Sequence, residues 1–140
     1  MARLRFLWII HTTSTSANAD TESAFRLVLP ISDGTTVGFP FPNLPSPDER
    51  ERGVTEQYMF DFRNIQDEFL MEFLQADDIS IRILGSDAWL PSSIWAIGED
   101  INSNRRLLAG VPNWPTTIER GWFSTDTSEG RPIRSLQLQP

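Results

Sequence analysis

Residues 79–83 read Ile-Ser-Ile-Arg-Ile, the most regular alternation of apolar and polar side chains in the sequence. A period of two residues predicts a half-buried β-strand, and β-branched isoleucine favours extended backbone. The turn residues Gly85, Ser86 and Asp87 follow at once and end the strand. The chain is therefore expected to build a sheet with one face against a core.

Similar alternation recurs outward from this stretch in both directions. We expect further strands at residues 4–10, 25–29, 58–62, 93–97, 107–109, 121–124 and 133–138. Residues 64–76 fit a short helix and a strand equally well, because apolar side chains recur there at every fourth and at every second position. The proline-rich segment 34–47 is expected to be mostly a crossing loop. Short strands with frequent turns predict an all-β fold, an antiparallel β-sandwich of about seven to eight strands.

Length and composition indicate a single domain spanning residues 1–140. The chain is 39% hydrophobic and contains five Trp and nine Phe. A domain of this size buries roughly 68–70% of the surface that its unfolded chain exposes. The twelve basic residues are all arginine, and the formal net charge is −7. This sign disfavours a nucleic-acid partner.

The sequence excludes several kinds of active site. It has no cysteine, so it forms no disulfide, no thiolate metal site and no cysteine nucleophile. His11 is the one histidine and lies in an expected strand, away from any nucleophile-elbow sequence. Without lysine there is no Walker A loop. We therefore expect a binding module and not an enzyme.

The amino terminus admits two interpretations. Arg3 and Arg5 precede an apolar run at 6–10, and the small residues 17–19 resemble an export cleavage site. An export signal needs roughly 7–15 apolar residues, however, and this run has five. Because Leu4, Phe6, Trp8 and Ile10 also alternate, we favour a first strand. The compartment is not determined, and the cytoplasm is slightly favoured.

Acidic residues gather in expected turns, where their oxygens suit calcium. The clusters are Asp20 with Glu22, then Asp48, Glu49 and Glu51, then Glu99, Asp100 and Asn102. None has the spacing of an EF-hand. They are interpreted either as calcium ligands or as solvated turns that keep the surface soluble.

Large apolar residues in polar loops are the candidate contact residues. Trp89 and Leu90 lie in a Ser- and Pro-containing loop, and Trp114 lies between two prolines. Such side chains either contact a membrane or partner, or fold back over the ends of the sandwich. Phe39 and Phe41 carry the same two interpretations, as an apolar rim or as a core-capping segment.

Several motifs in order resemble one known family. They are a polar turn at 18–22 before the strand 25–29, the turn 51–53 before the aromatic strand 58–62, the strand 79–83, Asp87 and Trp89 before Ile94, and the aromatic segment 121–124. Over residues 4–125 this order resembles the PLAT domain, a β-sandwich also called the lipoxygenase-homology domain. In the family's Gly-Thr-Asp turn, this chain has Asp20 for the glycine and Glu22 for the aspartate.

The resemblance implies a non-catalytic module that binds a membrane, a lipid or a protein partner, with or without calcium at the acidic loops. It also implies a packing role for Trp89. A second hypothesis is a structural or assembly protein that docks through its proline-rich and aromatic loops. A third is a carbohydrate-binding sandwich in which Trp114 or Trp122 stacks on sugar rings. The sequence does not determine the oligomeric state.

Overall fold

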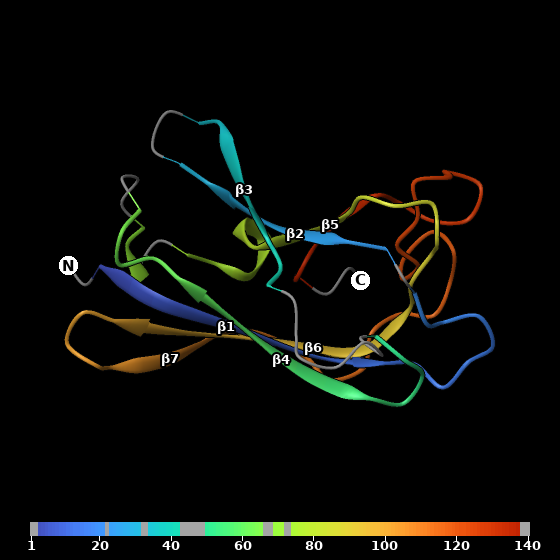
Figure 1. Ribbon diagram of the computed structural model, residues 1–140, viewed down its shortest axis with the longest axis horizontal. Helices are drawn as coiled ribbons and strands as arrows, with labels where there is room; N and C mark the ends of the chain where they lie inside the picture. The colour runs from blue at the N-terminus through green and yellow to red at the C-terminus, as the bar shows by residue number, and fades with distance from the viewer. Residues whose placement is uncertain are drawn as a thin grey trace.

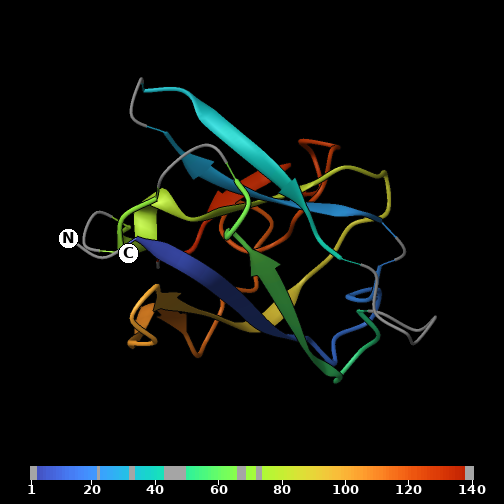
Figure 2. The same cartoon turned by 60° about the vertical axis from the view of Figure 1, so that its left-hand side comes forward.

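The computed structural model describes residues 3–21, 23–31, 34–42, 50–65, 69–71 and 74–137. Within these residues the chain forms two facing β-sheets (Figures 1 and 2). The strands are β1 (Leu4–Thr13), β2 (Phe25–Pro30), β3 (Thr36–Pro40), β4 (Thr55–Asp61), β5 (Ser80–Ile83), β6 (Pro91–Asp100), β7 (Arg105–Val111) and β8 (Ile133–Ser135), with a 3-10 turn η2 (Ala76–Asp78) before β5. No helix in the described residues is long and apolar enough to cross a membrane. The predicted all-β sandwich is confirmed.

Each sheet has four strands, and every pairing between them is antiparallel. The first sheet has the order β4-β1-β6-β7 and the second has the order β3-β2-β5-β8. β6 and β7 form a hairpin, whereas β1 and β4 are neighbours in space but distant in sequence. The first sheet is the lower layer in Figure 1.

The stretch that predicts the fold lies at the centre of the second sheet. Ile81 and Ile83 of β5 are at most 1% exposed, while Arg82 between them is exposed. Ile81 pairs with Leu27 of β2, and Phe25 pairs with Ile83. One face of β5 thus packs into the core and the other faces water, as period-two alternation requires.

β1 does the same for the first sheet, with an irregularity at its start. Leu7 and Ile9 point into the core and are fully buried. The register against β6 shifts between Leu4 and Phe6, so that Leu4 is buried whereas Phe6 is only half-buried. The irregularity thus brings Leu4 to the same side as Leu7 and Ile9, while Phe6, Trp8 and Ile10 alternate with these residues and face outward.

Aromatic rings fill the space between the sheets near one end. Trp89 contacts Phe25 and Phe123 at centroid distances of 4.9 and 5.3 Å, and Trp114 stacks on Phe123 at 5.8 Å. Phe25 belongs to β2, Trp89 to the connection between β5 and β6, and Trp114 and Phe123 to the loop after β7. The core is therefore continuous across the two layers.

Two local predictions need correction, and a third is tested only in part. Part of the expected loop 34–47 forms the edge strand β3, and residues 43–47 lie outside the described residues. An edge strand tolerates Pro40 at its end because edge positions need fewer backbone donors. Residues 121–124 form no strand, only isolated bridges at Phe123. In the described part of 64–76 there are one bridge at Leu70, a 3-10 helical residue at Met71 and the start of η2. Residues 66–68 and 72–73 lie outside the described residues.

Candidate functional site

The loop residues expected to contact a partner lie in the core. Trp89, Leu90 and Trp114 are only 1%, 1% and 6% exposed. The Trp89 indole donates a hydrogen bond to the Thr13 hydroxyl at 2.9 Å, and the Trp114 indole donates to the Gly121 carbonyl at 2.9 Å. Of the two interpretations, this burial favours side chains that fold back into the core. It also leaves Trp114 inaccessible for stacking on a sugar ring, whereas Trp122, the other candidate for such stacking, is half-buried. The loops fold back because each indole finds a polar partner inside.

Phe39 and Phe41 also pack inward, although each is partly exposed. Phe39 contacts Phe62 edge-on at a centroid distance of 5.1 Å. Phe41 contacts Tyr58 and Phe60, both at 5.0 Å. These rings cover the open side between β3 and β4 and do not form a free rim.

The acidic cluster at 99–102 is held by partners within the chain. Glu99 accepts hydrogen bonds from Arg5 and Arg105, which lower the pKa of its carboxyl group. Asp100 accepts hydrogen bonds from the backbone N–H groups of Asn102 and Asn104, at 2.8 and 3.0 Å. Such bonds are typical of a tight turn. Here these carboxylates organise the β6–β7 hairpin.

Within the described residues, the other predicted calcium ligands are not brought together. Asp20 faces Arg52 at 3.9 Å. Glu22, Asp48 and Glu49 lie outside the described residues. Across the residues that the structure describes, no three His, Asp or Glu side chains converge as a metal site would require. The calcium prediction therefore gains no ligand set from this structure.

His11 is enclosed in the core instead of facing a cleft. Its side chain is 1% exposed and lies between Tyr58 and Trp89, at centroid distances of 5.2 and 4.9 Å. Neither ring nitrogen has a hydrogen-bond partner in the described part of the chain. Burial, and secondarily the charge of Arg50, lowers the pKa of the imidazole to about 3. This histidine is neutral at physiological pH and is shielded from any substrate in solvent.

The outer side of the first sheet, in contrast, carries apolar side chains from all four strands. We call this surface the apolar face; it comprises Phe6, Trp8, Ile10, Met59, Trp95, Ile97 and Leu107. All of them are partly or largely exposed, with Met59 at 47% and Leu107 at 56%. Antiparallel sheets that face water normally carry polar residues on that side. This arrangement is an exposed apolar patch of the kind that marks an interaction site.

The register aligns these side chains in rows across the sheet. Trp8 is paired with Met59 of β4 on one side and with Ile97 of β6 on the other, and Ile97 is paired in turn with Leu107 of β7. One row thus crosses the whole sheet without a polar residue. Directly paired side chains lie close enough to touch, so the row is a continuous apolar surface.

In the row that contains Trp95, the indole ring lies flat against the backbone of the neighbouring strand. Trp95 is paired with Ile10 on one side and with Gly110 on the other. A Cβ atom on Gly110 would lie 2.7 Å from the Trp95 ring. The indole therefore rests against the backbone of β7, and a glycine at position 110 is what makes that possible.

Arginines border the apolar face at the end nearest the β6–β7 hairpin. The guanidinium of Arg105 lies 5.0 Å from the Trp8 ring centroid, and those of Arg5 and Arg63 lie 5.1 and 5.0 Å from the Phe6 centroid. Glu99 and Asp61 form ion pairs with these arginines. Three positive charges and two negative charges give this border a local charge of +1. A shallow hollow of about 240 Å³ adjoins Trp8, Ile10 and Arg105.

The sequence pattern predicts part of this surface but not its exposure. The alternation of Phe6, Trp8 and Ile10 was the evidence for the first strand. The intervening residues Leu7 and Ile9 are equally apolar, so the pattern alone does not show which side faces the core. Trp95 and Ile97 alternate in the same way within β6. Two neighbouring strands that are apolar on both sides were the signal that could have revealed the surface.

Comparisons with known proteins show a likeness in structure. No protein-family model matches the sequence, and no curated protein is similar in sequence. The alpha toxin of Clostridium absonum aligns over 97% of this chain, with a TM-score of 0.68 and 17% sequence identity. The alpha toxin of Clostridium perfringens aligns over 96% of this chain, with a TM-score of 0.64 and 20% sequence identity. This chain spans 32% of each toxin chain.

Lipoxygenases align less closely. A coral 8R-lipoxygenase, described as showing calcium activation via a C2-like domain, aligns over 77% of this chain and 16% of its own, with 15% identity. Its TM-score is 0.49. The toxin likenesses concern the fold alone. The chain therefore shares the β-sandwich fold of the matching third of the alpha toxins, in agreement with the PLAT-like sandwich that the order of its sequence motifs predicted.

Proposed function

We propose that this chain is a non-catalytic module that binds the surface of a lipid membrane through its apolar face. The observation that carries the proposal is the uninterrupted row Met59–Trp8–Ile97–Leu107, which crosses the outer side of the first sheet. Monomeric proteins rarely expose a contiguous apolar surface of this kind without using it.

The residue types suit the boundary between lipid headgroups and hydrocarbon. Tryptophan is enriched at that boundary because its ring is apolar and its N–H is polar. Arginine extends an apolar stem and keeps its charge at the level of the phosphates. Trp8 with Arg105 beside it combines the two. A half-exposed side chain such as Leu107 gains roughly 1 kcal/mol when it leaves water.

Electrostatics adds little to this contact. The chain carries a net charge of −7, which opposes approach to anionic lipid. The border of the apolar face is locally +1, because its three arginines outnumber Asp61 and Glu99. Binding is therefore driven by apolar contact, with only a weak dependence on anionic lipid and on salt.

The toxin likenesses agree with an accessory role, since this chain matches about a third of each toxin. Membrane binding assisted by calcium is the alternative, and the experiment below compares binding with and without calcium. Glu99 and Asp100 are already held by Arg5, Arg105 and backbone donors, so we expect binding to need no calcium.

The test is co-sedimentation with phosphatidylcholine vesicles, with and without a fraction of anionic lipid, in calcium and in a chelator. The test variant Met59→Glu/Leu107→Glu places two carboxylates on the apolar face, at side chains that are about half exposed. The matched control Leu84→Glu/Ile118→Glu changes two equally exposed side chains outside that face.

Wild type and control should pellet in both calcium and chelator, and the test variant should stay in the supernatant. Pelleting only with calcium would move the contact to the acidic loops. If the wild type stays in the supernatant under all conditions, the lipid proposal is overturned. A protein partner or a second copy of this chain would then be the occupant of the apolar face. Sedimentation velocity on the same sample tells those two apart.

A further inference from the structure

A pocket that shares no residue with the apolar face carries a separate inference. The loop at 112–131 leaves the first sheet after β7 and returns to the second sheet as β8. Between this loop, the β1–β2 connection and the β5–β6 connection lies a pocket of about 540 Å³, and small-molecule sites typically measure about 300–1,000 Å³. We call it the Trp122 pocket, and its described lining includes Trp122, Ile118, Asn18, Ser86, Asp87 and Glu129.

Alternation along the loop turns the Trp122 ring away from the core. Phe123, the next residue, is fully buried and forms an isolated bridge with Trp89, and both of these rings pack between the sheets. Successive side chains of extended backbone point to opposite sides. The Trp122 ring therefore stays half-buried, and it lines the pocket together with Ile118, a side chain that is 45% exposed. These two side chains give the pocket an apolar wall.

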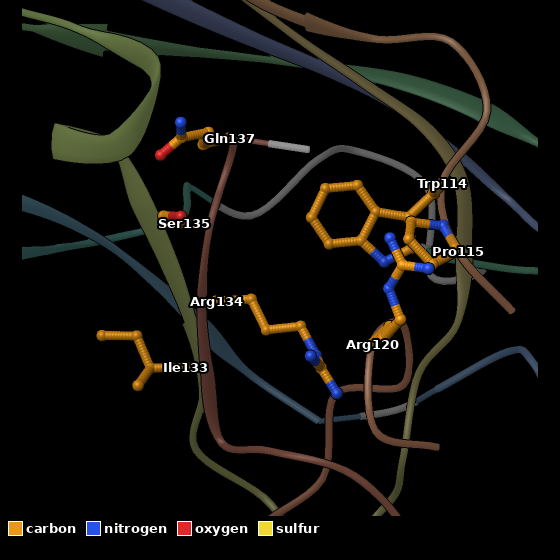
Figure 3. Close-up of a pocket in the computed structure, with 7 residues that line it drawn as sticks. All are labelled: Trp114, Pro115, Arg120, Ile133, Arg134, Ser135 and Gln137. Atoms are coloured by element: carbon orange, nitrogen blue, oxygen red, sulfur yellow. The ribbon is translucent and has the colours of Figure 1, made fainter. Parts of the chain in front are cut away.

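Arg134 of β8 fixes the position of this apolar wall. Its guanidinium donates to the carbonyls of Trp122, Glu119 and Ile118 at 3.0, 3.0 and 2.9 Å. Figure 3 shows Arg134 extending from β8 toward the loop, where it lines a second hollow together with Trp114. Because one guanidinium binds the carbonyls of both wall residues, Trp122 and Ile118 are held in place before any ligand arrives.

The polar part of the lining comes from the two other connections and from the end of the same loop. Asn18 lies between β1 and β2 and has a left-handed backbone, with a φ of 63°. In the β5–β6 connection, the Asp87 carbonyl accepts from the Ser23 hydroxyl at 2.9 Å, and the Asp87 N–H donates to the same oxygen at 3.1 Å. Glu129 accepts from the Ser124 hydroxyl at 3.3 Å, which uses one of the roughly four lone-pair sites of a carboxylate. An amide and carboxylates thus border the pocket on anchored segments.

From this arrangement we infer that the Trp122 pocket binds an uncharged sugar. One face of a sugar ring presents C–H groups, which stack on an aromatic ring, while its hydroxyl groups both donate and accept hydrogen bonds. Such a ligand requires an apolar wall with a few fixed polar groups beside it. Trp122 is the stacking surface, the Asn18 amide both donates and accepts, and the Glu129 carboxylate accepts from sugar hydroxyl groups.

The lining fits a sugar better than it fits the cations that carboxylates also attract. Organic cations are typically enclosed by a cage of aromatic rings, and Trp122 is the one aromatic ring among the described lining residues. Calcium needs about 6–8 oxygen ligands. Within the part of the chain that the structure describes, no three His, Asp or Glu side chains converge as such a site would require.

The direct test follows the indole N–H signals of the isotope-labelled whole chain by NMR. The probes are methyl α-D-mannopyranoside, methyl β-D-galactopyranoside and methyl N-acetyl-β-D-glucosaminide, with tetramethylammonium and calcium as contrasting cations. A glycan array with the same chain extends the search to larger sugars. Trp122→Phe assigns the Trp122 signal, because it removes one of the five indoles.

Two variants remove the stacking ring and the amide separately. Trp122→Leu removes the ring. Asn18→Gly removes the amide and keeps the backbone conformation, since glycine adopts a positive φ freely. The matched control is Ser103→Gly, at a residue with a φ of 67° in the β6–β7 turn and outside the pocket lining. Circular dichroism verifies that each variant keeps the fold.

At least one sugar should shift the Trp122 signal saturably in the millimolar range, with equal affinity in wild type and Ser103→Gly. Asn18→Gly should bind that sugar about fivefold more weakly, the loss expected for one hydrogen bond. Trp122→Leu, followed through its backbone amide signals, should show no saturable shift.

Three results would overturn the inference. They are a wild type that binds none of the sugars and no glycan on the array, a Trp122 signal that responds only to a cation, and a Trp122→Leu or Asn18→Gly variant that binds the sugar as well as wild type does. These titrations contain no vesicles, so their result is independent of whether the apolar face binds lipid.

Discussion

Replacing His11 with leucine should make the protein less sensitive to mild acid. The imidazole lies on the inner side of β1 with neither nitrogen hydrogen-bonded in the described residues, and its pKa is lowered to about 3. Tyr58, Trp89 and the charge of Arg50 surround it, and Glu56 lies directly opposite in β4. A proton therefore binds the unfolded chain much more readily than the folded one.

The magnitude follows from this difference in pKa. Because the folded-state value is the lower one, stability is lost as pH falls below the unfolded value of 6.5, and the loss continues down to about 3. Between pH 7 and pH 5 the unfolded chain gains most of one proton, which lowers the free energy of unfolding by about 2 kcal/mol. Since His11 is the one histidine, this loss has a single origin.

Urea denaturation of wild type and His11→Leu at pH 7, 6 and 5 measures the effect. At pH 7 the variant should be as stable as wild type or roughly 1 kcal/mol more stable, because an unpaired buried donor and acceptor are removed. The difference between the free energies of unfolding of His11→Leu and wild type should then increase by about 2 kcal/mol in favour of the variant by pH 5. Carboxylates titrate in both proteins and cancel in the comparison. Parallel pH profiles, or an imidazole NMR titration near pH 6.5, would refute the reasoning.

Two further substitutions probe the core and the apolar face. Trp89→Phe should lower the free energy of unfolding, measured by urea denaturation, by about 2–3 kcal/mol. The reason is that the buried Thr13 hydroxyl loses its 2.9 Å partner and a cavity opens. The control Trp122→Phe changes a half-buried ring and should lower the free energy of unfolding much less. Gly110→Ala should push the Trp95 ring off β7, costing about 1–3 kcal/mol, and reduce vesicle binding; an unchanged midpoint and unchanged binding would show that the ring does not rest there.

The sequence predicted best the strands in which one side is plainly apolar. In β5 isoleucine alternates with Ser80 and Arg82, and in β4 aromatic residues alternate with Gln57, Met59 and Asp61, so the period and the buried face are both evident. The hairpin between β6 and β7 was also predictable, since polar turn residues separate the two apolar runs. These features depend on neighbours in sequence.

Features that depend on distant parts of the chain were predicted poorly. β3 contains Pro40, which favours a loop until the sheet order shows that β3 is an edge strand. Trp114 lies in a loop of turn residues, and only the fold shows that its ring stacks on Phe123 and that its indole N–H donates to the Gly121 carbonyl. Leu4 and Trp8 would share one side of a regular strand, and only the register irregularity between Leu4 and Phe6 explains why Leu4 is buried while Trp8 faces outward. Local composition does not encode such tertiary contacts.

Fluorescence quenching by bromine-labelled lipid tests the apolar face most directly. Trp8 and Trp95 lie on the apolar face, whereas Trp89 and Trp114 are buried between the sheets. Vesicles with bromines near the headgroup end of the acyl chain should quench part of the wild-type emission, and the Trp8→Phe/Trp95→Phe variant should still pellet but lose that quenching. Vesicle-bound wild type without quenching, or a double variant quenched as strongly as wild type, would contradict the proposed contact.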